Sequence, residues 1–178
     1  MDQVSHELKK FFFQNIQLKM FLKKDEFSKV IKNTPLIAID ICILKGRNIL
    51  LGKRINPPAK DFFFVPGGRI RKSELMKNAF ERILRTELGF SLKNDDFNFA
   101  KNIGCYEHLY EDNFLGNNDF GTHYVVIAYL ILYEYLFKKS NEIKSEQHSE
   151  YIWVNLDEKN SNNTRVHPNT LEYFKILK

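Results

Sequence analysis

The sequence has few cysteines and no long uninterrupted apolar run, and each shortage argues against a class of protein. Its 178 residues include two cysteines, Cys42 and Cys105, both in apolar, strand-like stretches, and no C-x-x-C motif. This pattern disfavours a disulfide-linked secreted domain and predicts reduced thiols in a cytoplasmic protein. The nearest candidate for a membrane segment, residues 11–22, is interrupted by two glutamines, Asn15 and Lys19. It is too short and too polar for a transmembrane helix or a signal sequence.

The chain also lacks an internal repeat, a linker and a second apolar core, so its length suits one domain. Its hydrophobic content of 43% is ordinary for a globular protein. The net charge of +5 favours anionic partners, but the lysines are scattered, so neither nucleic acid nor a membrane is an expected partner. We predict one domain over residues 20–178, preceded by an extension, residues 1–19, that packs on the domain or on a second subunit. Met20 is an alternative start of the chain.

The order of the predicted elements indicates an α/β protein of the α+β type, with helices on the faces of a mixed sheet. Isoleucines at every second position from 37 to 43 predict a strand, and Asp40 stands among them. Strands are predicted at residues 36–44, 49–54, 62–65, in parts of 97–110 and 123–137, and at 151–154. Helices are predicted at residues 25–33 and 169–177 and after a glycine turn at 67–68, with polar loops at 111–121 and 138–150.

Residues 67–90 contain a glycine pair, a predicted helix and a further glycine, in the sequence GGRIRKSELMKNAFERILRTELGF. This stretch resembles the Nudix box, G-x5-E-x7-R-E-U-x-E-E-x-G-U, in which U is an aliphatic residue. The positions that fit are Gly68, Glu74, Arg82, Leu84, Glu87, Gly89 and Phe90. Ile83 and Thr86 stand where the family usually has glutamates. The resemblance implies a Nudix fold, with a mixed central sheet between helices, and action on a nucleoside diphosphate linked to another group.

The helix of the box carries one carboxylate where the family pattern has three. Positions 83, 86 and 87 are related by i+3 and i+4 and share one face. Glu87 alone suits a single metal ion whose other ligands come from elsewhere. Ser73 is the predicted N-cap, and Arg82 is expected to have a structural role by pairing with Glu74 or Glu87. The residues expected to hold the helix on its sheet are Leu75, Ala79, Leu84 and Leu88.

Stretches outside the box narrow the resemblance: MFLKKDEF, NTPLIAID, LLGKR, FVPGGR, AFER, YEHLYEDNF, THYVV and EQHSEYIWV. Together they are similar to the GDP-mannose mannosyl hydrolases, a bacterial Nudix subfamily that departs from the box at the same two positions. The resemblance implies hydrolysis of GDP-mannose, or of GDP-glucose, to GDP and free sugar. In this reaction, water attacks the anomeric carbon with inversion, and Mg²⁺, or Mn²⁺ as a substitute, is required. The resemblance also implies a homodimer.

The same resemblance implies a metal site and a catalytic base. The implied metal ligands are Glu87, Gln147 through its amide oxygen and Gly67 through its backbone carbonyl. His148 is the implied base, because histidine titrates near neutral pH and can accept a proton from water. Its alternative role is that of a solvated loop histidine. Gly67 is also expected to form a turn that only glycine fits.

The remaining implied residues bind the substrate. Arg54 and Arg69 are implied to bind the diphosphate, because guanidinium groups stay charged and pair bidentately with phosphate oxygens. Asp40 interrupts an apolar strand, so a polar cleft with sugar hydroxyls or an arginine is expected beside it. His108 and Tyr124 are implied to contact phosphate oxygens, with a structural histidine and a core aromatic as their alternatives.

Two competing functions stay open on the sequence alone. One is a conventional Nudix pyrophosphohydrolase that attacks phosphorus, which the missing glutamates and the Gln147–His148 motif disfavour. The other is a non-catalytic Nudix module that binds a nucleotide, which the joint presence of Glu87, Gln147 and His148 disfavours. The preference for guanine and for mannose rests on the resemblance alone.

Overall fold

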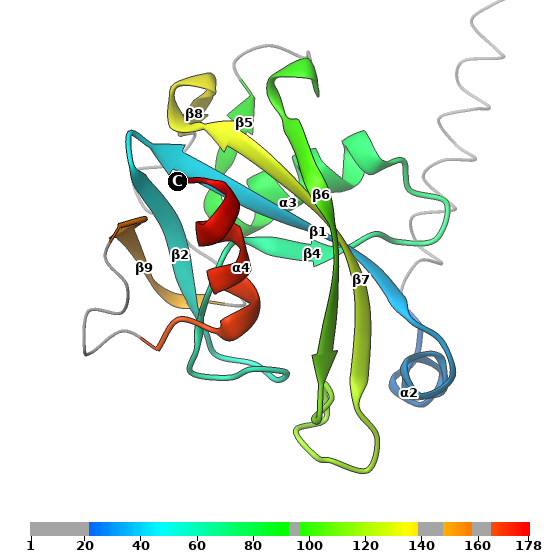
Figure 1. Ribbon diagram of the computed structural model, residues 1–178. Helices are drawn as coiled ribbons and strands as arrows, with labels where there is room; N and C mark the ends of the chain where they lie inside the picture. Colours follow the sequence, from blue (N-terminus) through cyan, green and yellow to red (C-terminus); the bar gives the residue numbers. More distant parts are fainter. Residues whose placement is uncertain (1–21, 93–96, 139–147, 158–164) are drawn as a thin grey trace, which may run out of the picture.

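The computed structural model describes residues 22–92, 97–138, 148–157 and 165–178, which form a mixed β-sheet with helices around it (Figure 1). The N-terminal extension and Gln147 lie outside these described residues. The first described helix, α2 (Lys24–Asn33), leads into strands β1 (Leu36–Lys45) and β2 (Asn48–Arg54), close to the predicted ranges. None of the described helices is long and apolar enough to cross a membrane.

The central sheet combines parallel and antiparallel pairs. Its strand order is β3–β2–β1–β7–β6; β1 and β7 run parallel, and the other pairs are antiparallel. Strand β4 pairs with β1, and β9 pairs with β2. A separate two-stranded sheet joins β5 and β8. The bounds are β3 Phe63–Phe64, β4 Gly67–Arg69, β5 Phe90–Leu92, β6 Lys101–Tyr110, β7 Thr122–Leu132, β8 Leu136–Lys138 and β9 His148–Asn155, with 3-10 turns at Phe97–Phe99 and Tyr133–Tyr135.

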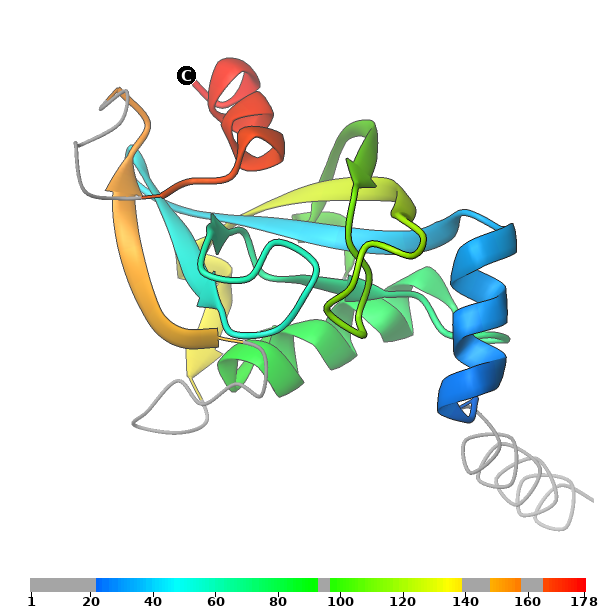
Figure 2. The same ribbon diagram turned by 90° about the horizontal axis from the view of Figure 1, so that it is seen from below.

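Alternation along β1 divides the core into two layers. The isoleucines at odd positions from Ile39 to Ile43 pack against α3 (Met76–Leu88). Cys42, which is a free thiol, packs on the opposite face with α4 (Pro168–Ile176). Figure 2 shows α3 and α4 on opposite sides of the sheet, with α2 beside the start of β1. The structure thus confirms the predicted mixed sheet between helices.

Helix α3 begins and packs differently from its predicted form. Ser73 is not the N-cap: it has φ 62°, and Leu75 occupies the cap position without a side-chain cap bond. The chain stays in a turn as far as Glu74, whose amide donates to the Arg71 carbonyl at 3.1 Å. Leu75, which lies before the helix, is 70% exposed and does not help to hold it. The buried residues are Ala79, Phe80, Ile83, Leu84, Glu87 and Leu88.

The glycine pair forms a strand, so the predicted glycine turn is wrong. Gly67 and Gly68 belong to β4 and pair with Asp40 and Ile39 of β1. Close packing explains both glycines: a Cβ on Gly67 would collide with the Asp40 carboxylate, and a Cβ on Gly68 would lie 3.1 Å from the side chain of Ile83. Glycine is therefore needed at both positions, because the β4 backbone lies directly against the side chains of Asp40 and Ile83.

Candidate active site

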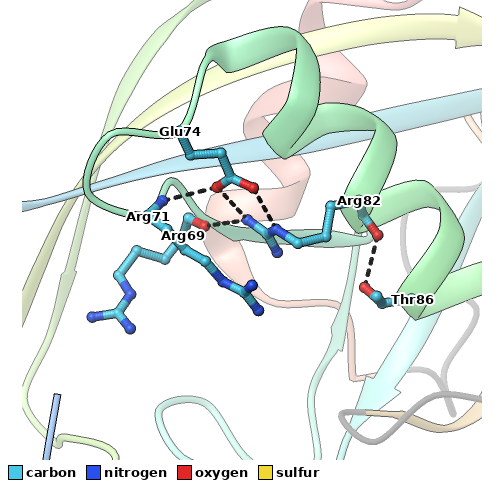
Figure 3. Close-up of polar contacts among 5 residues, drawn as sticks. All are labelled: Arg69, Arg71, Glu74, Arg82 and Thr86. Atoms are coloured by element: carbon cyan, nitrogen blue, oxygen red, sulfur yellow. Dashed lines mark hydrogen bonds and ion pairs between the residues drawn. The ribbon is translucent and has the colours of Figure 1, made fainter. Parts of the chain in front are cut away.

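Glu74 and Arg82 of the box form a bidentate ion pair (Figure 3). Arg82 donates from Nε to Glu74 Oε1 at 2.7 Å, and from Nη2 to Glu74 Oε2 at 2.8 Å and to the Arg69 carbonyl at 2.9 Å. The Arg71 amide adds a bond to the Glu74 carboxylate at 3.0 Å. Burial alone would raise the pKa of Glu74, but the bonds from Arg82 and Arg71 lower it. Of the two carboxylates considered for Arg82, the partner is Glu74. The bond from Arg82 to the Arg69 carbonyl ties α3 to β4.

Glu87 and His148 meet where α3 approaches β9. His148 Nδ1 lies 3.5 Å from Glu87 Oε2 and 3.1 Å from the hydroxyl of Tyr151. That hydroxyl donates its proton to the Glu87 backbone carbonyl at 3.0 Å. Because the carbonyl can only accept, the Tyr151 oxygen must accept from His148 Nδ1. This pattern assigns the proton of the neutral imidazole to Nδ1 and the lone pair to Nε2.

His148 lies in a strand, although the sequence predicted a loop. It is the first residue of β9, stands opposite Arg54 of β2 and is 6% exposed. Its ring covers Gly52, where an added Cβ would lie 2.7 Å from ring atoms of both His148 and Tyr151. The next two residues of β9 are exposed, so the sequence here is polar like that of a loop although the backbone is a strand. Pairing with β2 fixes the histidine beside Arg54.

Ile83 and Thr86, the two box positions without glutamates, differ in their surroundings from Glu87 and from each other. Ile83 is 1% exposed and belongs to the core between α3 and the sheet. Thr86 is exposed, and its hydroxyl donates to the Arg82 carbonyl at 2.9 Å (Figure 3). The face expected to point at a metal is therefore divided: position 83 turns into the core, position 86 toward solvent, and Glu87 toward His148.

The Gly67 carbonyl is not used by the pairing of β4 with β1. The Ile41 amide donates to the Pro66 carbonyl at 2.8 Å, which marks a hydrogen-bonded position of this ladder. Bonded and open positions alternate along antiparallel strands, so Gly67 turns its carbonyl away from β1. Magnesium prefers oxygen ligands of the kind that this carbonyl and the Glu87 carboxylate carry.

Within the described ranges, no three histidine, cysteine, aspartate or glutamate side chains gather closely enough to hold a metal ion. The donors that fit magnesium are one carboxylate, Glu87, and one neutral oxygen, the Gly67 carbonyl. The third implied ligand, Gln147, lies outside the described residues. A carboxylate and a neutral oxygen are ligand types that magnesium accepts beside water and substrate oxygens.

Asp40 is a buried carboxylate that receives a hydrogen bond from the last helix. The Tyr173 hydroxyl of α4 donates to Asp40 Oδ2 at 2.8 Å. Burial raises the pKa of Asp40 to about 6, while the Tyr173 bond and the charge of Arg54 act in the opposite direction. We expected sugar hydroxyls or an arginine beside this carboxylate. In the structure, Tyr173 satisfies it directly, and Arg54 acts on it through charge.

His108 is neutral at physiological pH. It is 4% exposed, and burial, followed by the nearby His167, lowers its pKa to about 4. Its Nδ1 lies 4.0 Å from Asp40 Oδ2, so this contact joins a neutral imidazole to the carboxyl group and is not an ion pair. A neutral imidazole can still donate one hydrogen bond to an anionic ligand.

Tyr124 lies within electrostatic range of Asp40, Arg54 and Arg69. Burial raises the pKa of Tyr124, the charges of Arg54 and Arg69 oppose this, and Asp40 adds to it. Tyr124 is also the cross-strand partner of His108 between β7 and β6. The two arginines thus lie close enough to the Tyr124 phenol for their charges to act on it.

Sequence reasoning missed the tyrosines and the histidine that support these groups. His167, the N-cap of α4, stacks on Phe64 at 4.4 Å between ring centroids, and Tyr110 lies 5.5 Å from the same imidazole. Tyr110 and Tyr151 occur inside the stretches YEHLYEDNF and EQHSEYIWV, so the motifs contained them without showing their partners. Tyr173 carries no local signal, because its partner is 133 positions away.

Comparisons with known proteins identify the family and the fold. A family model described as NUDIX domain matches residues 34–174. Low-salt glycan biosynthesis protein Agl8 of Haloferax volcanii is 33% identical over 105 residues, which is 59% of this chain and 64% of that protein. The chain therefore spans a little under two thirds of this curated relative.

Solved structures show the same fold. A MutT NUDIX hydrolase from Burkholderia pseudomallei superposes with a TM-score of 0.63 at 21% identity, over 80% of this chain and 98% of that one. The NUDIX domain of Shewanella oneidensis NrtR, solved in complex with ADP ribose, superposes with a TM-score of 0.56 at 15% identity, over 86% and 96%. Nudix hydrolases generally use divalent metals and bind small nucleotide substrates. The box, the fold and the family match together show that this chain belongs to the Nudix hydrolase family.

Proposed function

We propose that the protein hydrolyses a GDP-sugar, GDP-mannose or GDP-glucose, to GDP and free sugar by attack of water on the anomeric carbon with inversion. The observation that carries this proposal is the placement of His148. It lies beside Arg54, is fixed by Tyr151, and faces the only carboxylate among positions 83, 86 and 87 of α3. A histidine base next to a phosphate-binding arginine suits attack on the carbon that bears the diphosphate.

His148 acts as the base through Nε2. Its Nδ1 proton is engaged by Tyr151, so Nε2 has the lone pair that takes a proton from the attacking water. The imidazolium formed in this step lies 3.5 Å from Glu87 Oε2, which stabilises its positive charge. Tyr151 and Gly52 hold the imidazole in one orientation. The Tyr151 hydroxyl bonds Nδ1, and the lack of a side chain on Gly52 lets the ring pack against the backbone.

The leaving diphosphate is bound by charge and by hydrogen bonds. Arg54 and Arg69 bind its oxygens, while Tyr124 and neutral His108 donate hydrogen bonds to it. Asp40, held by Tyr173, orders the arginines and the sugar side of the site. Glu87, the Gly67 carbonyl and Gln147 would hold one Mg²⁺ or Mn²⁺ ion, which supplies positive charge to the leaving group when bound.

The relative's name adds support from sugar metabolism, since Agl8 is described as a glycan biosynthesis protein. We also propose that the enzyme is a cytoplasmic homodimer that binds neither nucleic acid nor membrane. The resemblance to the subfamily and the apolar residues of the N-terminal extension support the dimer.

A screen of nucleotide sugars with identification of every product tests the proposal. Purified protein with Mg²⁺ is incubated with GDP-mannose, GDP-glucose, UDP-glucose and ADP-ribose, and products are followed by anion-exchange chromatography and proton NMR. We expect GDP and a free sugar whose first-formed anomer is inverted. GMP with a sugar phosphate would instead establish a pyrophosphohydrolase. Binding without turnover of any compound would establish a nucleotide-binding module.

A further inference from the structure

The loop between β6 and β7, residues 111–121, is built around a fully buried asparagine. Asn113 is 0% exposed, and the two protons of its Nδ2 are shared among three oxygens: the Asn117 carbonyl at 3.1 Å, Asn117 Oδ1 at 2.7 Å and the Phe120 carbonyl at 2.8 Å. Its Oδ1 accepts from the Leu115 amide at 2.9 Å. The sequence predicted a polar loop here, and the structure shows an internally bonded one with a defined shape.

This loop supports an aromatic ring that carries an arginine. Phe114 packs on Phe27 of α2, with ring centroids 5.0 Å apart at a tilt of 53°. On Phe27 lies the guanidinium of Arg69, 3.9 Å from the ring centroid. Three elements distant in sequence, the 111–121 loop, α2 and β4, thus form a stack that ends in an arginine of the proposed site.

A second contact links the loop to the other arginine. Gly116 approaches Pro57, where a Cβ on the glycine would lie 3.5 Å from the proline ring. The neighbouring Pro58 carbonyl accepts from Arg54 Nε at 2.9 Å. The 111–121 loop therefore contacts Phe27, which packs on Arg69, and approaches Pro57, which precedes the residue that binds Arg54.

The way in which Arg69 is held differs from the way in which Arg82 is held. Arg82 uses its in-plane N–H groups on Glu74 and on a backbone carbonyl. Arg69 instead has its guanidinium carbon 3.9 Å over the centroid of the Phe27 ring, a cation–π contact that does not use up its N–H groups as hydrogen bonds to an acceptor would. Burial, first among the causes, lowers the pKa of Arg69, yet an arginine stays charged in proteins. A guanidinium placed by an aromatic ring can use two N–H groups to bind two phosphate oxygens bidentately.

We propose that Phe27 positions Arg69 for a diphosphate, and that Phe114 and the Asn113-centred loop hold Phe27 in place. Phe27 is a positioning residue: it touches the arginine and not the phosphate. The inference rests on the proposed role of Arg69 in binding the diphosphate. A purely structural role for the stack, in which the rings only attach α2 to the domain, makes a different prediction for the coupling between Phe27 and Arg69.

The test is a double-mutant cycle on the affinity for inorganic pyrophosphate with Mg²⁺, measured by calorimetry on the full chain. We expect Phe27→Leu to raise the Kd for pyrophosphate by about 3- to 10-fold, the range of a partly desolvated cation–π contact. Phe27→Tyr, which keeps the ring, should restore wild-type affinity. In an Arg69→Met background, Phe27→Leu should cause no further loss. Phe99→Leu, which disrupts the Phe99–Tyr135 ring pair elsewhere, is the matched control and should leave the Kd unchanged.

Equal effects of Phe27→Leu in both backgrounds, or no effect at all, would overturn the proposal. If Phe27→Leu unfolds at the assay temperature, Phe114→Leu replaces it, because α2 then keeps its own ring; we expect a smaller loss that again needs Arg69. If the effect of Phe27→Leu on pyrophosphate binding depends on Arg69 but no GDP-sugar is hydrolysed, the proposed function is wrong and the positioning role of Phe27 stands. If GDP-sugar is hydrolysed but the effects of the two substitutions are additive, the proposed function stands and the positioning role is wrong. A wild-type protein that binds no pyrophosphate contradicts both proposals.

Discussion

The two faces of the central sheet use ionisable side chains differently. On the face toward α3, Glu74 and Arg82 form a bidentate pair within 2.8 Å, and Glu87 Oε2 lies 3.5 Å from His148 Nδ1. These groups are placed by short contacts to defined atoms. Because each has an oppositely charged or proton-donating neighbour, charge can be kept on this face at modest cost.

On the face toward α4, burial drives the ionisable groups toward their neutral forms. It raises the pKa of Asp40 to about 6 and lowers the pKa of both His108 and His167 to about 4. Rings of tyrosine and phenylalanine surround these groups and exclude water. This difference shows that the α3 face holds charged groups through specific short contacts, whereas the α4 face presents neutral hydrogen-bond donors.

The comparison is tested most strongly by removing His148, the proposed proton acceptor on the α3 face. We expect His148→Ala to lower kcat for the GDP-sugar by about 10²- to 10⁴-fold with a smaller change in KM, because a positioned base contributes that much. His123→Ala, a histidine on β7 next to Tyr124 in sequence, is the matched control and should stay within a few-fold of wild type. An unchanged kcat in His148→Ala would remove it as the base.

The orientation of His148 can be disturbed without touching it. Gly52→Ala places a methyl group 2.7 Å from the His148 and Tyr151 rings, so the imidazole must move. We expect a fall in kcat of at least about tenfold, within the range that a misplaced base costs. Gly46→Ala is the control: φ is +58° there, but the space is open, so stability should fall by about 1 kcal/mol and kcat should not change. Equal kcat values for the two variants would contradict the packing of His148 on Gly52.

The cost of breaking the buried ion pair measures how firmly the α3 face places its charges. We expect Glu74→Gln to lower the free energy of unfolding by about 2–4 kcal/mol, because Arg82, 16% exposed, is left without its carboxylate. Asp157→Asn breaks a pair with Arg47 of similar geometry but more than half exposed, and its denaturation midpoint should match wild type. Similar losses for both variants would mean that burial does not strengthen the box pair.

The smallest effect concerns the neutral histidines of the α4 face. The pKa of His167 is lowered to about 4 by burial and by Arg54. Below pH 6.5 the unfolded chain therefore binds a proton at this histidine that the folded chain does not bind. Stability from this group is therefore lost as pH falls from about 6.5 toward 4. His167→Asn keeps a side-chain acceptor for the Asn169 amide and removes the titration. In urea denaturation from pH 7 to 4, wild type should lose stability relative to the variant; parallel curves would show that His167 titrates normally.

Sequence alone could predict the part of the site that is local in the chain. The spacing from Gly68 to Gly89 fixed the box helix, and Glu74 was already one of two partners considered for Arg82. The ranges of β1 and β2 followed from the apolar pattern and the turn between them. These features depend on neighbours within a few turns of chain, which periodicity can reveal.

The rest depends on contacts between distant segments. Nothing near Asp40 indicates that Tyr173 would satisfy it, and nothing near Arg69 indicates Phe27. The glycine turn was wrong because Gly67 is required by the approach of Asp40 from another strand, which backbone propensity does not encode. Helical spacing puts position 83 on one face with Glu87, but the burial of Ile83 is decided by the sheet beneath the helix.

The bond that is broken decides between the proposed function and its nearest rival. Hydrolysis of GDP-mannose in water enriched in oxygen-18, followed by mass spectrometry of both products, reports which atom the water attacks. With His148 as the base for attack on carbon, we predict one labelled oxygen in the free sugar and none in GDP. Label in a phosphate group of either product would contradict this account and assign the enzyme to the phosphorus-attacking Nudix hydrolases.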